Sequence, residues 1–136
     1  MSQSWKPDGY PSLSPYVIVP DARRVIAFLE DAFGGTVLRR FDRPDGGVMH
    51  AEVRIEDGVV MLADAVDGWP ASPIHLHLYL RDVDASYRRA LELGGEAVQP
   101  PVQKEGDPDR RGGVKDPAGN TWWLSTQVGA AATAAP

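Results

Sequence analysis

Several features are missing from this 136-residue sequence, and each absence excludes a class of function. There is no cysteine, which excludes thiolate nucleophiles, thiolate metal sites and disulfides, and fits a reducing compartment. No apolar run approaches the roughly 18 residues that span a bilayer, and the N-terminal residues lack the pattern of a signal peptide. We therefore expect a cytoplasmic protein without a membrane partner.

Clustered positive charge is also absent. The net charge is −5, and the basic residues form only short pairs such as Arg39-Arg40 and Arg88-Arg89. Nucleic-acid binding requires clustered Lys and Arg, so we expect no nucleic-acid partner. The chain likewise contains no phosphate-binding loop, dinucleotide fingerprint or nucleophile elbow in the required context.

A strand that leads directly into a helix occurs twice. In residues 74–81, alternate side chains are aliphatic, while His75, His77 and Tyr79 lie on the other side, which predicts a strand with two different faces. A helical pattern follows, which Asp82 or Asp84 can cap and Gly94-Gly95 can end. The same pattern occurs about 61 residues earlier, in residues 14–35. We interpret the chain as two copies of one module.

Turn signals divide each copy into a strand, a helix and three further strands. We therefore predict an α+β fold of two tandem βαβββ modules in one domain, which line a shared cleft. The predicted boundaries are a lead-in over 1–12, a domain over 13–127 with modules 13–64 and 74–127 and a linker over 65–73, and a disordered tail over 128–136.

The strand pattern assigns side chains to faces in the first module, whose first strand is predicted over residues 13–19. Alternation over residues 48–56 predicts a core face and a polar face; the core face holds Met49, Ala51, Val53 and Ile55, and the polar face holds His50, Glu52 and Arg54. The Asp57-Gly58 pair predicts a two-residue turn. That turn would place Arg54 opposite Met61 and Glu52 opposite Ala63.

The second module is less regular. Its pattern predicts a short strand over residues 96–98, a long loop over residues 99–110 and another strand over residues 112–115. A tight turn over residues 116–119 precedes the last strand, residues 120–127, in which Trp123 shares the polar face.

Four stretches resemble a known family: SPYVIVPDARRVIAFLEDAFGG, PDGGVMHAEVRIEDGVVMLAD, LYLRDVDASYRRALELGG and GGVKDPAGNTWWLST. Over residues 13–127 the chain is similar to the vicinal oxygen chelate superfamily, in its glyoxalase, bleomycin-resistance and PhnB-like branch. The resemblance implies the tandem βαβββ fold. It also implies either metal-dependent catalysis or binding of a small molecule without a metal.

The resemblance assigns four metal ligands to Ser14, Met61, His75 and Trp123, of which only His75 is a competent donor. Divalent cations need three or four oxygen or nitrogen donors, so we expect no metal cofactor. A displaced divalent-metal site remains an alternative, because His75 and His77 share one strand face at about 6.5 to 7 Å spacing and His50 and Glu52 have the same spacing.

We predict that the cleft binds a small planar or aromatic molecule and that the protein is a homodimer. The predicted ligand-binding residues are Tyr16, His50, Glu52, Arg54, Met61, His75, His77, Tyr79 and Trp123. Arg54 either holds an anionic group or pairs with a neighbouring glutamate. Two alternatives stay open: a lyase, isomerase or dioxygenase that uses the displaced His/Glu site, and a scaffold whose own side chains fill the cleft.

Overall fold

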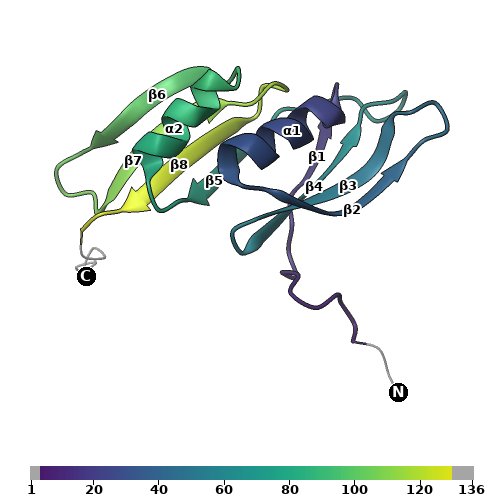
Figure 1. Cartoon of the computed structure of the whole chain (residues 1–136), viewed down its shortest axis with the longest axis horizontal. Helices are drawn as coiled ribbons and strands as arrows, with labels where there is room; N and C mark the ends of the chain where they lie inside the picture. Colours follow the sequence, from purple (N-terminus) through teal and green to yellow (C-terminus); the bar gives the residue numbers. More distant parts are fainter. Residues whose placement is uncertain (1–3, 130–136) are drawn as a thin grey trace. The chain divides into compact units, whose positions relative to one another are not determined.

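The two repeats of the sequence form two units in the computed structural model, which describes residues 4–129. The units are Met1–Ser72 and Pro73–Pro136, and the boundary between them in the sequence falls inside the predicted linker. Each contains one four-stranded sheet and one helix (Figure 1). Within residues 4–129 no helix is long and apolar enough to cross a membrane. Of the predicted tail, residues 130–136 lie outside the described residues.

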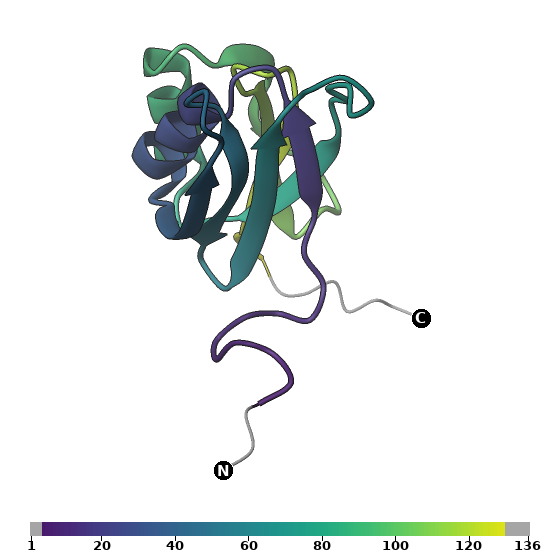
Figure 2. The same cartoon turned by 90° about the vertical axis from the view of Figure 1, so that its right-hand side faces the viewer.

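The first unit has the predicted order of elements. They are β1 (Tyr16–Val19), α1 (Ala22–Phe33), β2 (Thr36–Asp42), β3 (Val48–Ile55) and β4 (Gly58–Asp64). The strand order is β1-β4-β3-β2, with β1 parallel to β4 and the other pairs antiparallel. Figure 2 shows β1 beside β4. The first strand begins at Tyr16 rather than at Leu13.

Local signals set the ends of α1, and burial sets its orientation. The Asp21 carboxylate accepts the amide of Arg24 at 3.4 Å, and Gly34 ends the helix in the left-handed region at φ 71°. Helix α1 covers one face of the sheet (Figure 1), and its buried residues form one stripe along the helix. Burial of this stripe stabilises the unit, since each fully buried aliphatic or aromatic side chain contributes about 1.5 to 3 kcal/mol.

The second unit repeats this arrangement. It contains β5 (His75–Tyr79), α2 (Val83–Glu92), β6 (Glu96–Gln103), β7 (Asp109–Lys115) and β8 (Thr121–Gln127). The strand order is β5-β8-β7-β6, and β5 is parallel to β8. Asp82, not Asp84, caps α2 by accepting the amide of Ala85 at 3.1 Å. The predicted α+β fold with two βαβββ modules is therefore confirmed.

The predicted core position of Met49 is wrong. A register shift between β2 and β3 pairs Phe41 with His50 but Asp42 with Val48, so β3 carries one extra residue at this point. Such a bulge reverses the alternation. Val48 is fully buried in the place predicted for Met49, whereas Met49 is 50% exposed.

The predicted hairpin register is also wrong. Ile55 pairs with Gly58, so the turn contains Glu56 and Asp57, and Glu56 has a positive φ of 54°. Arg54 consequently faces Val59, and Glu52 faces Met61. In the predicted register Asp64 would have faced buried Ala51. In the observed register Ala51 pairs with Leu62, and Asp64 lies two residues farther along β4, where its carboxylate accepts the amides of Ala22 and Val48.

The strands β6 and β7 are longer than predicted, and the loop between them is shorter. Pro100 and Pro101 lie inside β6, although proline is usually excluded from paired strands. The structure accommodates them because β6 is an edge strand with two register shifts against β7. The proline pair therefore marks an irregular edge and not the loop that we expected.

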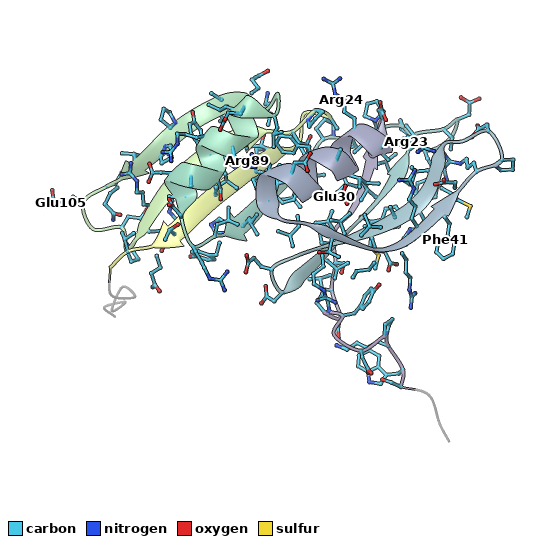
Figure 3. All side chains as sticks on the ribbon, in the orientation of Figure 1. Arg23, Arg24, Glu30, Phe41, Arg89 and Glu105 are labelled. Atoms are coloured by element: carbon cyan, nitrogen blue, oxygen red, sulfur yellow. The ribbon has the colours of Figure 1, made fainter. Side chains whose placement is uncertain are left out.

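The face of each sheet away from its helix carries the predicted polar residues, and we call it the distal face. The first distal face comprises Tyr16, Ile18, Arg39, His50, Glu52, Arg54, Met61 and Ala63. The second comprises His75, His77, Tyr79, Arg111, Gly113, Trp123 and Ser125. Phe41, labelled in Figure 3, extends from β2 on the side away from α1, and its ring lies 6.3 Å from that of His50.

Candidate functional site

A cavity of about 480 Å³ lies in the first unit. Most of its lining is aliphatic or aromatic, and the lining residues are Tyr16, Ile18, Arg43, Met49, Ala63, Asp64, Val66 and Trp69. The bulge in β3 brings Met49 to this side. After β4 the chain turns back through a backbone bridge between Val66 and Trp69, which holds the indole at the cavity.

Two charged groups lie at the cavity. The Asp64 carboxylate accepts the amides of Ala22 at 2.6 Å and Val48 at 2.7 Å, and so joins the starts of α1 and β3 to the end of β4. The Arg43 guanidinium donates to the main-chain carbonyl of Asp64 at 3.3 Å. The carboxylate is thus committed to backbone amides, while Arg43 offers further N–H donors to an occupant.

A chain of four polar side chains follows the first distal face. The hydroxyl of Tyr10 donates to Glu52 at 2.5 Å, the second oxygen of Glu52 lies 2.8 Å from Nε2 of His50, and Nδ1 of His50 lies 3.0 Å from the Tyr16 hydroxyl. Glu52 is buried, with 4% exposure, whereas Tyr16 is 49% exposed and lines the cavity. The buried carboxylate therefore orients an imidazole toward a phenol at the cavity wall.

Opposing effects set the ionisation of this chain. Burial alone would raise the pKa of Glu52, but hydrogen bonds from Tyr10 and His50 and the charges of His50 and Arg39 together lower it below its usual value. Burial and the hydrogen bond to Glu52 raise the pKa of Tyr10. Glu52 is therefore an anion at neutral pH, and Tyr10 is a neutral donor.

The second distal face is occupied by its own hydrogen bonds. Tyr79 donates to buried Asp109 at 2.6 Å, and Arg111 contacts Asp109 at 3.0 Å and Asp107 at 2.8 Å. Nε2 of His77 lies 3.0 Å from the hydroxyl of Ser125, which is fully buried. A hollow of about 130 Å³ beside Arg111 is far smaller than the first cavity.

Two pKa shifts follow from this network. Burial first, and then the charge of Arg111, lower the pKa of His77 against the opposing effect of Asp109. The hydrogen bond to Asp109 raises the pKa of Tyr79. His77 is therefore a neutral imidazole near pH 7, and Tyr79 remains a protonated phenol.

The four positions to which the resemblance assigns metal ligands do not fit a divalent metal. Ser14 has a buried hydroxyl with no hydrogen-bond partner, and Met61 offers a thioether. The indole N–H of Trp123 donates to Nδ1 of His75 at 3.1 Å, with the two rings stacked 6.2 Å apart. Within residues 4–129, no group of three or more His, Asp or Glu side chains is placed to hold a metal.

The predicted ligand-binding residues fall into one group in each unit. Tyr16, His50 and Glu52 are in direct contact, while Met61 lines a second cavity, of about 240 Å³, with Tyr10. Arg54 donates to the carbonyl of Gly9 at 3.0 Å. In the second unit, the rings of His77 and Tyr79 meet edge to face at 4.7 Å, and His75 contacts Trp123.

Sequence reasoning missed several residues. Tyr10 lies in the segment that we treated as a lead-in, and Trp69 lies in the predicted linker. Asp109 and Arg111 lie in strand β7, where we expected a loop to continue as far as residue 110. An aromatic residue inside a Gly- and Pro-rich segment was the one available signal for Tyr10 and Trp69, because such segments rarely need a large apolar side chain.

Comparison with known proteins identifies relatives over most of the chain. The family model described as Glyoxalase/Bleomycin resistance protein/Dioxygenase superfamily matches residues 13–124. An uncharacterised protein of Mycobacterium bovis is 38% identical over 129 residues, which cover 87% of this chain and 84% of that protein. An uncharacterised protein of Mycobacterium tuberculosis is also 38% identical, with 87% and 75% covered.

Solved structures share the fold at low sequence identity. TioX from Micromonospora sp. ML1 matches with a TM-score of 0.71 and 23% identity, over 85% of this chain and 97% of TioX. Glyoxalase I from Zea mays matches with a TM-score of 0.69 and 21% identity, over 86% of this chain and 44% of that protein. A PhnB protein from Bacillus cereus, titled a putative 3-demethylubiquinone-9 3-methyltransferase, gives 0.69 and 15%, over 85% and 99%.

Proposed function

Because the chain belongs to the Glyoxalase/Bleomycin resistance protein/Dioxygenase superfamily, we propose that it binds a small planar or aromatic molecule without a metal. The observation that carries this proposal is the cavity of about 480 Å³ in the first unit. Pockets for small molecules usually measure about 300 to 1,000 Å³ and combine apolar walls with a few polar groups. This cavity has that size and that lining.

The cavity wall favours a flat ligand. Tyr16 and Trp69 supply aromatic surfaces, and they remain 49% and 63% exposed. Stacking on such a ring contributes about 0.5 to 1.5 kcal/mol beyond the burial of area. Arg43 supplies the cation for an acidic substituent on the ligand, since a guanidinium binds carboxylate or sulfonate groups through paired N–H donors.

Two dyes of similar shape test the proposal. The probes are 8-anilino-1-naphthalenesulfonate, which combines a flat naphthalene ring with an anionic sulfonate, and N-phenyl-1-naphthylamine, which lacks the sulfonate. We expect saturable binding of both by protein treated with a chelator, at one site per chain. Trp69→Ala should weaken both by about tenfold, and Arg43→Gln should weaken only the anionic dye. Leu13→Ala is the control, because Leu13 is exposed and lies outside this cavity. Equal binding by wild type and Trp69→Ala would place the site elsewhere.

A second candidate function is catalysis, as a lyase, isomerase or dioxygenase. The observation that favours it is the contact of Glu52 with His50 and of His50 with Tyr16, because an oriented imidazole next to a phenol can move a proton at the cavity wall. Metal analysis tests the form of this second function that depends on a metal. Stoichiometric bound metal that is lost in His75→Ala would contradict metal-free binding and support the displaced His/Glu site.

The second distal face keeps a smaller place in the proposal. Its hollow of about 130 Å³ beside Trp123 admits only a small group, and the imidazole of His75 already accepts the indole N–H. We propose that the ligand also contacts an aromatic wall formed by Trp123, His75, His77 and Tyr79. Trp123→Ala should therefore weaken dye binding less than Trp69→Ala does.

Assembly and location complete the proposal. We propose a homodimer, in which a sheet of one chain closes a cleft against a sheet of its partner. The exposed apolar side chains Phe41 and Met49, each 50% accessible, support it. We also propose a cytoplasmic location, supported by the absence of cysteine. A sedimentation mass of one chain at micromolar concentration would contradict the dimer.

A further inference from the structure

The segment before β1 contacts the first distal face, and Tyr10 makes the side-chain hydrogen bond of this contact. Tyr10 donates to Glu52, and the guanidinium groups of Arg39 and Arg54 lie 5.5 and 6.0 Å from the centre of its ring. The neighbouring carbonyl of Gly9 accepts from Arg54. Residues 4–12 form no strand with the sheet, so these side-chain contacts hold the segment in place.

Glu52 makes this contact chemically specific. Its carboxylate is buried, and a buried carboxylate is costly unless donors satisfy it. His50 donates from the sheet itself at 2.8 Å, and Arg39 lies 3.8 Å away. The other strong donor, the Tyr10 hydroxyl, comes from outside the sheet. One oxygen of this buried carboxylate therefore takes its donor, a hydroxyl group, from outside the sheet.

The surroundings of Tyr10 match a phenol ring. Two guanidinium groups lie near its ring, an arrangement that favours the negative π face of an aromatic over an aliphatic alcohol. The cavity of about 240 Å³ at this place is lined by Met61 and Arg39 of the sheet and by Trp5, Lys6 and Pro7 of the segment. The ring is attached to the chain through its para carbon, so that side of the site admits a substituent.

We propose that the pocket at Glu52 is a second binding site, specific for para-substituted phenols, which Tyr10 of the same chain occupies. A phenolic ligand enters by displacing residues 4–12, donates its hydroxyl to Glu52 and places its ring near Arg39 and Arg54. This site differs from the cavity at Trp69, because the two share no lining residue. Phenolates and aromatic carboxylates are excluded, since their charge would oppose that of Glu52.

A tethered tyrosine competes with a free phenol. Short flexible links give effective concentrations in the millimolar range, so wild-type protein should bind added phenol only weakly. Removing the side chain should expose the site to p-cresol, which is the tyrosine side chain as a free molecule. The full-length Tyr10→Ala variant should therefore bind p-cresol at least tenfold more tightly than wild type does.

Calorimetric titration and thermal unfolding of Tyr10→Ala test the proposal, with p-cresol as the probe and p-methylanisole as its match without a hydroxyl donor. We expect at least tenfold preference for p-cresol and an increase in Tm with p-cresol alone. The preference should disappear in Tyr10→Ala/Glu52→Leu, which has no acceptor for the hydroxyl, and survive in Tyr10→Ala/Trp69→Ala. Survival in the latter separates this site from the dye-binding cavity, whatever the dyes show. Equal affinity for the two probes, or for wild type and Tyr10→Ala, would overturn the proposal.

A measurement on wild-type protein covers the case in which Tyr10→Ala does not fold. At high concentrations of p-cresol, the amide resonances of Gly9 and Tyr10 should move toward the values of an unstructured peptide as the segment is displaced. The same concentration of p-methylanisole should leave them unchanged. Displacement by both probes, or by neither, would contradict a phenol-specific site.

Discussion

The two units use the same backbone pattern for opposite purposes on their distal faces. In the first unit Tyr16 pairs with Met61, which also pairs with Glu52 on the next strand. At the equivalent positions of the second unit His77 pairs with Trp123, which also pairs with Gly113. A Cβ atom at Gly113 would lie 2.8 Å from the ring of Trp123. The indole thus takes the space of a side chain at this position. One repeated backbone arrangement therefore supports an accessible cavity in one unit and a filled surface in the other.

The helix connections show the same contrast. The amide of Ala22 at the start of α1 donates to the Asp64 carboxylate, and the equivalent amide of Val83 in α2 donates to the Thr126 hydroxyl at 2.8 Å. Asp64 also binds the amide of Val48, whereas Thr126 donates to the carbonyl of Leu80. We call this contact between the helix start and the sheet the helix joint. Its acceptor is a charged carboxylate in the first unit and a neutral hydroxyl in the second.

The largest expected effect tests whether the core faces are equivalent. Val17 and Leu78 are 3% and 9% exposed at matching places beside the helices. Val17→Asp and Leu78→Asp should each lower the free energy of unfolding by about 3 to 5 kcal/mol, because each buries an unpaired charge. Urea denaturation measures the loss. His77→Ala, on the other face, is the control and should cost less than about 1 kcal/mol; the opposite order would reverse the face assignment.

The helix joints should differ in strength. Asp64→Ala removes a charged acceptor from two backbone amides and should cost about 2 to 4 kcal/mol, while Thr126→Val removes a neutral hydroxyl and should cost about 1 kcal/mol. Chemical denaturation of the two variants compares the joints directly. Asp67→Ala, in the linker after β4, controls for loss of a carboxylate in general. Equal costs for Asp64→Ala and Thr126→Val would show that the charge at the first joint adds no stability.

The contact of Gly113 with Trp123 should appear as non-additivity. Gly113→Ala should cost about 1 to 3 kcal/mol in the wild-type protein, because the methyl group forces the indole to move. In Trp123→Ala the same change should cost much less. A double-mutant cycle from thermal unfolding measures the difference. Additive costs would mean that the indole does not restrict this position.

The smallest expected effect is a pH dependence that differs between the units. The lowered pKa of His77 means that the unfolded chain takes up a proton that the folded chain resists, so stability falls as the pH decreases below 6.5. The lowered pKa of Glu52 produces a further fall below pH 4.5. Denaturation at a series of pH values should show that His77→Gln reduces only the first fall and Glu52→Gln only the second. An unchanged profile in both variants would refute the assignment.

Patterns of short range predicted most of the fold. The alternation of residues 74–81 placed His75, His77 and Tyr79 on the face away from α2, and Asp21 and Asp82 cap the helices as their positions suggested. These features depend on neighbours a few residues apart, so they can be read from one chain. The turn signals predicted the order of elements, and the family resemblance implied the same order, which the structure confirms.

The errors arose where distant residues decide the outcome. The bulge that exposes Met49 depends on how β2 pairs with β3, and the hairpin register depends on how β3 pairs with β4. Tyr10 lies 42 residues from Glu52 in the sequence, so no local pattern connects them. The candidate site contains several such long-range contacts, and for that reason it was harder to predict than the fold.

The sequence by itself determined the two βαβββ modules, their helix caps, the alternation of their strands and the residue types available on each distal face. Only the tertiary structure decided which of these residues meet. Strand register brings Glu52 and Met61 together, the bulge turns Met49 to the cavity, and the chain after β4 brings in Trp69. Periodicity fixes the direction of a side chain relative to its own strand, but contact depends on the pairing of segments that are far apart in the chain.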